Sequence, residues 1–349
     1  CVQFGILVAP QEPVVRRMTK THPLGLAALL VIALNAPASS AARRAATRSP
    51  SASAVLWHDP VNIARRDLRY GPGGRKHQPK GPFRFVKEDL KGSNVKFVVT
   101  GADGVKWTIK LGEEAHPETA ASRILWAAGY FANEEYFLPD VRVEGMPLNV
   151  HRGADKVGPD GVMHNARLKR HRKGGESGIW RWKDNPFTGT REFNGLRVMM
   201  ALINNWDLKD VNNAVYKADG RQVYLVSDLG ASFGTNNRSV TQTASKGNLD
   251  HYTESKFITG VTPVAVDFAV PGRPAFIHAI EIGEFKSRVG MEWIGKNIPI
   301  GDVRWIGSIL ARLSPAQIHA AFDAAGYSSN EATGFSSVLE TRIGDLNRL

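Results

Sequence analysis

A segment that starts near residue 82 alternates apolar and polar side chains. Three runs follow this period of two, namely residues 83–87, 95–99 and 105–110. An Asp103-Gly104 turn separates the last two runs, and this combination predicts antiparallel strands. Residues 118–130 then carry apolar side chains at helical spacing, so we expect a helix directly after the third strand.

The rest of the chain mixes further strands with helices. Short runs typical of strands lie at residues 141–143, 162–168, 214–216 and 223–226. Helical spacing is found at residues 190–204, 285–297, 303–313, 315–326 and 330–346. Residues 235–265 follow neither period and predict a long polar loop. The order predicts an α+β fold with an antiparallel β-rich N-terminal lobe and an α-helical C-terminal lobe.

The first 41 residues have the form of an export signal. Met18 precedes a lysine, an apolar run at residues 24–34 and small residues up to Ala41, which is the order found in secretory signal peptides. We expect residues 1–17 to lie upstream of the true start. Cleavage after residues 18–41 would then release a periplasmic or extracellular protein. The apolar run is shorter than the roughly 18 to 20 residues of a spanning helix, so the mature chain should have no transmembrane segment.

Composition divides the remaining chain into four parts. They are a flexible leader at residues 42–54, a short helical brace at 55–81, a β-rich lobe at 82–178 and a helical lobe at 179–349. The single cysteine, Cys1, excludes an internal disulfide, a Cys-rich zinc site and a distant cysteine nucleophile. The net charge of +12 favours anionic partners such as cell-envelope polymers, but no motif predicts specific nucleic-acid recognition.

Five polar residues occur in an order that suits phosphoryl transfer. This reaction needs a cation at the phosphates, an acid that positions it, metal ligands, and a carboxylate that orients the attacking hydroxyl. The candidates are Lys110 at the end of the third strand, Glu118 on the next helix, Asp207 and Asn212 after the buried helix, and Asp228 at the end of the last hairpin. Each residue type is common by itself, and only their order predicts this chemistry.

Two of these segments resemble protein-kinase motifs. Residues 207–212 read Asp-Leu-Lys-Asp-Val-Asn, which resembles the kinase catalytic loop, and residues 228–230 read Asp-Leu-Gly, which resembles the metal-binding Asp-Phe-Gly. The resemblance covers residues 82–235 and implies a two-lobed fold of the protein-kinase-like superfamily, in an atypical exported bacterial form.

The resemblance also implies a reaction that uses ATP and Mg²⁺. The implied roles are nucleotide binding for Lys110, Glu118, Gly92 and Ser93, catalysis for Asp207 as the base and for Lys209, and magnesium binding for Asn212 and Asp228. The turn around Gly92 lacks the Gly-x-Gly-x-x-Gly pattern, and no Ala-Pro-Glu follows Asp228. We therefore expect a hydroxyl acceptor that is a protein, a glycan or a small molecule.

Two alternatives belong to other classes. A kinase-like fold could serve as a non-catalytic binding module of the cell envelope, because export separates it from cytoplasmic ATP. A Gly-x-Ser-x-Gly pattern around Ser232 is typical of a hydrolase nucleophile elbow, with His251, His278 or His319 as its base. A polar stretch follows Ser232 where an elbow needs a helix, which weighs against the hydrolase. The cationic run at residues 167–173 is interpreted as a solvated face near the acceptor site.

Overall fold

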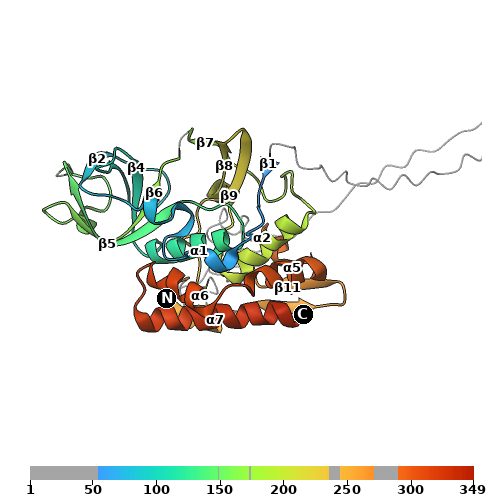
Figure 1. Cartoon of the computed structure of the whole chain (residues 1–349). Coiled ribbons are helices and arrows are strands. Elements are labelled where there is room, and N and C mark those ends of the chain that lie inside the picture. Colours follow the sequence, from blue (N-terminus) through green and yellow to red (C-terminus); the bar gives the residue numbers. More distant parts are fainter. Residues whose placement is uncertain (1–53, 148, 173, 236–243, 271–289) are drawn as a thin grey trace, which may run out of the picture. The chain divides into compact units, whose positions relative to one another are not determined.

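The computed structural model describes residues 54–147, 149–172, 174–235, 244–270 and 290–349. The predicted start, signal segment and most of the leader lie outside these residues. The fold class is confirmed: a β-rich N-terminal lobe and a largely α-helical C-terminal lobe form an α+β protein (Figure 1). None of the described helices combines the length and the apolar character that a membrane-crossing segment requires.

Five strands of the N-terminal lobe form one sheet that closes on itself. Its order is β2 (Phe83–Glu88), β3 (Lys96–Thr100), β4 (Lys106–Leu111), β6 (Val162–Arg170) and β5 (Glu135–Glu144). Neighbours are antiparallel, except that β2 pairs with β5 in parallel. Helix α1 (Ala115–Ala127) connects β4 to β5, as the sequence predicts. Side chains such as Trp107 and Ile109 fill the interior of the sheet, because every second residue of a strand points the same way.

The catalytic-loop motif lies between a buried helix and a small sheet. Helix α2 (Arg191–Leu202) begins at Thr190, whose hydroxyl accepts the backbone N–H of Phe193. The strands β8 (Asn213–Ala218) and β9 (Arg221–Val226) form the predicted hairpin. The hairpin is extended by β7 (Glu176–Gly178) on one side and by β1 (Ala54–Val55) on the other.

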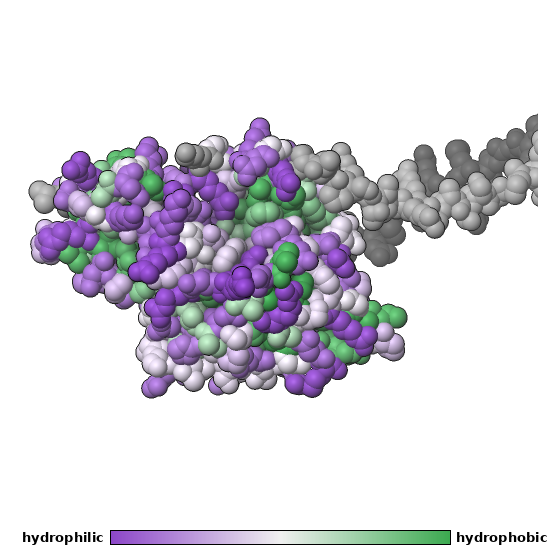
Figure 2. Space-filling view, in the orientation of Figure 1, coloured by the Kyte–Doolittle hydropathy of each residue, from purple (hydrophilic) through white to green (hydrophobic). Residues whose placement is uncertain are grey.

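Helices close the C-terminal lobe below α1 and α2 (Figure 1). They are α5 (Ile300–Leu310), α6 (Pro315–Asp323) and α7 (Ser329–Arg348). Ser314 and Ser328 form capping boxes at the starts of α6 and α7, which fixes both helices where the sequence predicts them. The main hydrophobic core joins α1 and α2 to these helices. On the face in Figure 2, hydrophilic areas alternate with smaller hydrophobic patches.

Three local predictions are wrong. The loop expected at residues 235–265 contains α3 (Leu249–Glu254) and β10 (Ile258–Val261), and β10 pairs with β11 (Ala265–Phe268). A helix was expected at residues 285–297, of which 290–297 are described. This part contains a 3-10 turn at Glu292–Gly295, and β12 (Ile298–Pro299) follows it. The brace expected as a helix consists of short 3-10 turns, because proline and glycine interrupt it.

Candidate functional site

Lys110 is the central cation of the site. It lies near the end of β4, on the face opposite to Ile109, and its side chain is only 2% exposed. Its Nζ atom lies 2.9 Å from Glu118 Oε2 and 3.3 Å from Asp228 Oδ1, and it also contacts Glu114 Oε2. Burial disfavours a charged lysine, but Glu118 and Asp228 outweigh burial and raise the Lys110 pKa. Lys110 is therefore held as a cation by three carboxylates.

Helix α1 supplies two of these carboxylates. Glu114 and Glu118 are four residues apart at the start of the helix, so their side chains lie one turn apart on the same side. Glu118 Oε2 also accepts a hydrogen bond of 2.7 Å from Arg167 Nη2 on β6. Glu114 contacts Lys246 with its second oxygen and accepts Asn94 Nδ2 at 2.8 Å. The carboxylates thus connect α1 to both strands and to the segment around Lys246.

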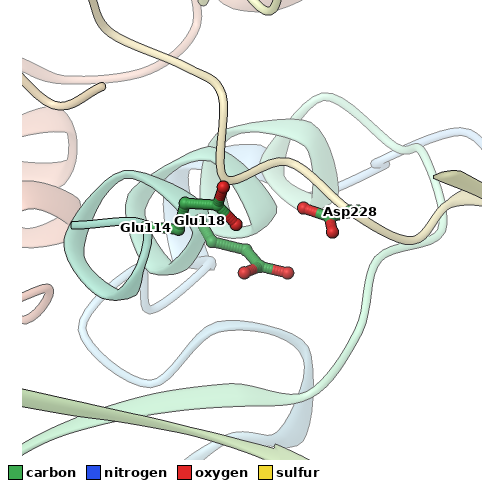
Figure 3. A group of neighbouring side chains, drawn as sticks. All are labelled: Glu114, Glu118 and Asp228. Atoms are coloured by element: carbon green, nitrogen blue, oxygen red, sulfur yellow. The ribbon is translucent and has the colours of Figure 1, made fainter. Parts of the chain in front are cut away.

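Asp228 follows β9 and faces α1. Figure 3 shows its carboxylate and those of Glu114 and Glu118 around one space. The backbone N–H of Gly230 donates to Asp228 Oδ1 at 3.1 Å. Burial alone would raise the Asp228 pKa, but Lys110 and this hydrogen bond lower it to about 2. Asp228 is therefore ionised at any physiological pH.

The loop that carries Asp207 is tied to Asp228 through Asn212. The side-chain amide of Asn212 donates to the Asp207 carbonyl at 2.6 Å, and the Asn212 carbonyl accepts the backbone N–H groups of Ser227 at 2.7 Å and Asp228 at 3.1 Å. Lys209 Nζ lies 3.2 Å from Asp207 Oδ1. The two motifs therefore hold one another in place.

These residues line one cleft with a volume of about 770 Å³. Pockets of this size accommodate small ligands of the size of a nucleotide. The eight residues singled out from the sequence all belong to its lining: Gly92, Ser93, Lys110, Glu118, Asp207, Lys209, Asn212 and Asp228. The structure thus brings the candidates together, while their individual roles stay predictions.

The donor set suits a hard cation such as Mg²⁺. The carboxylate of Asp228 and the amide oxygen of Asn212 are ligands of the kind that Mg²⁺ prefers, and both line the cleft. Asn212 uses its NH₂ group on the Asp207 carbonyl, so its side-chain oxygen is available. Carboxylate oxygens of Glu114, Glu118 and Asp228 lie within 4.8 Å of one another, but the ammonium group of Lys110 contacts all three residues. Arg167 also pairs with Glu118 and Lys246 with Glu114, so three cations balance the three carboxylates. Asn212 and Asp228 therefore fit a metal better than this acidic group does.

Several residues of the cleft were missed by the sequence reasoning. They are Glu114, Arg167, Lys169 and Lys246. The run that starts at Arg167 was expected to be solvated, but Arg167 is 3% exposed because it belongs to β6. The period of two along this strand was the signal that could have found Arg167 and Lys169, which lie on one face. Glu114 could have been found as the residue one helical turn before Glu118.

The serine hydrolase alternative does not agree with the structure. Ser232 is fully buried, and its Oγ has no hydrogen-bond partner among the described residues. The strand before it, β9, belongs to an antiparallel hairpin instead of a parallel sheet. His251 bonds Ser245 Oγ at 2.7 Å, and His278 lies outside the described residues. A buried hydroxyl that bonds no base among the described residues is not activated as a nucleophile there.

Comparison with protein-family models finds no match, and comparison with curated proteins finds none. Among solved structures, the chain is similar to the crystal structure of a proinflammatory kinase of Helicobacter pylori, CtkA. The TM-score is 0.41 at 10% sequence identity, and the similarity covers 76% of this chain and 96% of that chain. A likeness of this size assigns no activity, so the functional conclusion depends on the cleft itself.

Proposed function

We propose that the protein is an atypical kinase-like phosphotransferase that binds ATP and Mg²⁺ and transfers the γ-phosphoryl group to a hydroxyl acceptor. One observation carries the proposal. Lys110 is joined to Glu118 and Asp228 inside the same cleft that holds Asp207 and Asn212. Phosphoryl transfer depends on positioning and on charge stabilisation more than on covalent chemistry, and this cleft offers both.

Each residue of the cleft would have a separate role in phosphoryl transfer, set by its position. Lys110 would bind the phosphates, and Glu118, which itself accepts a hydrogen bond from Arg167, would hold Lys110 in a fixed orientation. Asp207 would accept the proton of the attacking hydroxyl, with Lys209 beside it to balance charge. Asn212 and Asp228 would hold Mg²⁺, which when bound neutralises charge on the phosphates. Asp228 keeps its negative charge for this role because its pKa is low.

The acceptor and the location of the protein belong to the same proposal. We propose a hydroxyl of a protein, a glycan or a small molecule as the acceptor, and export to the periplasm or the outside of the cell. The positive charge of the chain would concentrate it near anionic envelope polymers. Fractionation of cells that express the full chain checks the location, and recovery of the protein only in the cytoplasm would contradict it.

Binding is tested by thermal unfolding of the full chain with ATP, with Mg²⁺, and with both. Selective binding to the folded state raises the unfolding temperature, so we expect a rise that needs both ligands. Asp228→Asn should abolish this rise. Asp219→Asn is the matched control, because Asp219 is an exposed residue at the β8–β9 turn, outside the cleft. No rise at millimolar ATP and Mg²⁺ would refute the proposed nucleotide site.

Catalysis is tested separately with Asp207→Asn. We expect this variant to keep the thermal shift and to lose transfer of labelled phosphate from ATP, because Asp207 would act on the acceptor. A non-catalytic binding module is the second candidate, because Lys110 is already paired with three carboxylates instead of being free for phosphates. That candidate would be supported if the unchanged protein binds ATP but hydrolyses and transfers no phosphate.

A further inference from the structure

The lining of the cleft offers almost no apolar surface to a nucleobase. Among the described residues that line it, only Trp206, Val211 and Ala231 have apolar side chains. Trp206 is 9% exposed, donates its indole N–H to the Ser245 carbonyl at 3.1 Å, and has Lys246 Nζ 5.7 Å from its ring centre. Val211 is 71% exposed. The described lining therefore has no pair of apolar faces between which a purine could stack.

Charged side chains dominate the lining instead, with seven cations and six carboxylates. Besides Lys110 and Arg167, the cations are Lys91, Lys96, Lys169, Lys209 and Lys246. Most of them are neutralised by a partner at close range: Lys96 lies 3.5 Å from Asp89, for example, and Lys209 lies 3.2 Å from Asp207. This surface matches a ligand with several negative charges, because each phosphate can replace a carboxylate as the partner of a lysine.

Lys169 is a lysine of the lining that lies on the sheet itself and whose ammonium group has no such partner in the described part of the chain. It lies on β6 next to Thr108 of β4 and Glu135 of β5 in the strand register. Its side chain makes no hydrogen bond or ion pair with any described residue, although it lines the cleft two residues from Arg167. Burial and the nearby Arg167 lower the Lys169 pKa, so an anion would stabilise its charged form.

We propose that the cleft selects its phosphate donor by the polyphosphate chain and not by the base, and that Lys169 is a further phosphate-binding residue. This inference rests on the proposed function and names its substrate class. Nucleoside triphosphates with different bases, and inorganic triphosphate, should bind alike. The base contributes little because the lining has polar groups where stacking surface would be needed.

Titration calorimetry of the full chain in Mg²⁺ compares ATP, GTP, inorganic triphosphate and adenosine. The three triphosphates should agree in Kd within about threefold, and adenosine should not bind at millimolar concentration. An ATP affinity at least tenfold above that of inorganic triphosphate, or binding of adenosine, would overturn base-independent recognition and leave the proposed function intact. Failure of all four ligands to bind would overturn both.

Lys169→Met tests the residue itself. Loss of one contact between an ammonium and a phosphate should weaken ATP, GTP and inorganic triphosphate by the same factor, on the order of tenfold. Lys169→Arg should restore most of the affinity, and Lys217→Met, which changes an exposed lysine of β8, should leave it unchanged. An unchanged affinity in the folded Lys169→Met protein, or a loss limited to ATP, would overturn the role of Lys169.

Discussion

Glu135 gives the protein a specific dependence of stability on pH. Its side chain is 1% exposed, and neither carboxylate oxygen has a hydrogen-bond partner among the described residues. Arg167 Nη1 is 3.7 Å away, which is an ion-pair contact without a hydrogen bond. Burial raises the Glu135 pKa from its ordinary value of 4.5 to about 7, although Arg167 acts in the opposite direction. The folded protein therefore holds this proton more tightly than the unfolded chain.

The size of the effect follows from the two pKa values. Between pH 4.5 and pH 7 the folded state binds more protons, so the free energy of unfolding falls as the pH rises. The contribution of Glu135 is fully present below pH 4.5 and is lost above pH 7. At 1.36 kcal/mol for each pH unit, it amounts to about 3 kcal/mol. Glu135→Gln removes the titrating group while keeping the shape of the side chain.

Urea unfolding followed by tryptophan fluorescence measures this quantity at pH 5, 6, 7 and 8. We expect Glu135→Gln to gain stability relative to the unchanged protein as the pH rises. Glu144→Gln serves as the control, because Glu144 lies on the same strand with a side chain that is 53% exposed. A difference between Glu135→Gln and the unchanged protein that stays constant from pH 5 to pH 8 would refute the reasoning.

Two further substitutions test the packing around the site and the core. Arg167→Met removes the buried hydrogen bond to Glu118 and leaves Lys110 as the cation paired with it, so urea unfolding should show a loss of about 3–5 kcal/mol; a loss below about 1 kcal/mol would contradict a stabilising role of the Arg167–Glu118 pair. Phe335→Ala should cost about 3–5 kcal/mol in the same measurement, because this buried ring stacks on Phe322 at 5.2 Å between centres, whereas Phe335→Leu should cost less; equal losses would contradict a cavity effect.

The sequence predicted the elements whose local pattern and tertiary environment agree. The strands around Trp107 and Ile109 show a clear period of two, and helical spacing predicts α6 and α7. Other elements depend on distant partners. Ala54 and Val55 form strand β1 because they pair with β9. The three residues of β7, Glu-Ser-Gly, are all exposed, and they form a strand because they pair with β8. Such pairing leaves little trace in the local sequence.

The candidate site could be assembled from the order of its residues along the chain. Lys110 and Asp228 are adjacent in space because the end of a strand and the end of a hairpin meet at one cleft, as the order implied. The buried partners were harder to find. Charged side chains such as those of Arg167 and Glu135 are usually found on the surface, and only the pairing of β5 with β6 shows that these two lie close together inside the protein. Their contribution to the site is a property of the tertiary fold.

The sequence separation of the contacts described above has a consequence for folding kinetics. All strands of the five-stranded sheet fall within residues 83–170, whereas the pair of Lys110 and Asp228 joins positions 118 residues apart. Long-range contacts form more slowly because closing a long loop costs more chain entropy. During synthesis, the sheet can therefore close while the β8–β9 hairpin is still missing. We expect the N-terminal lobe to be folded before the cleft exists, so ligand binding would report only chains that have completed folding.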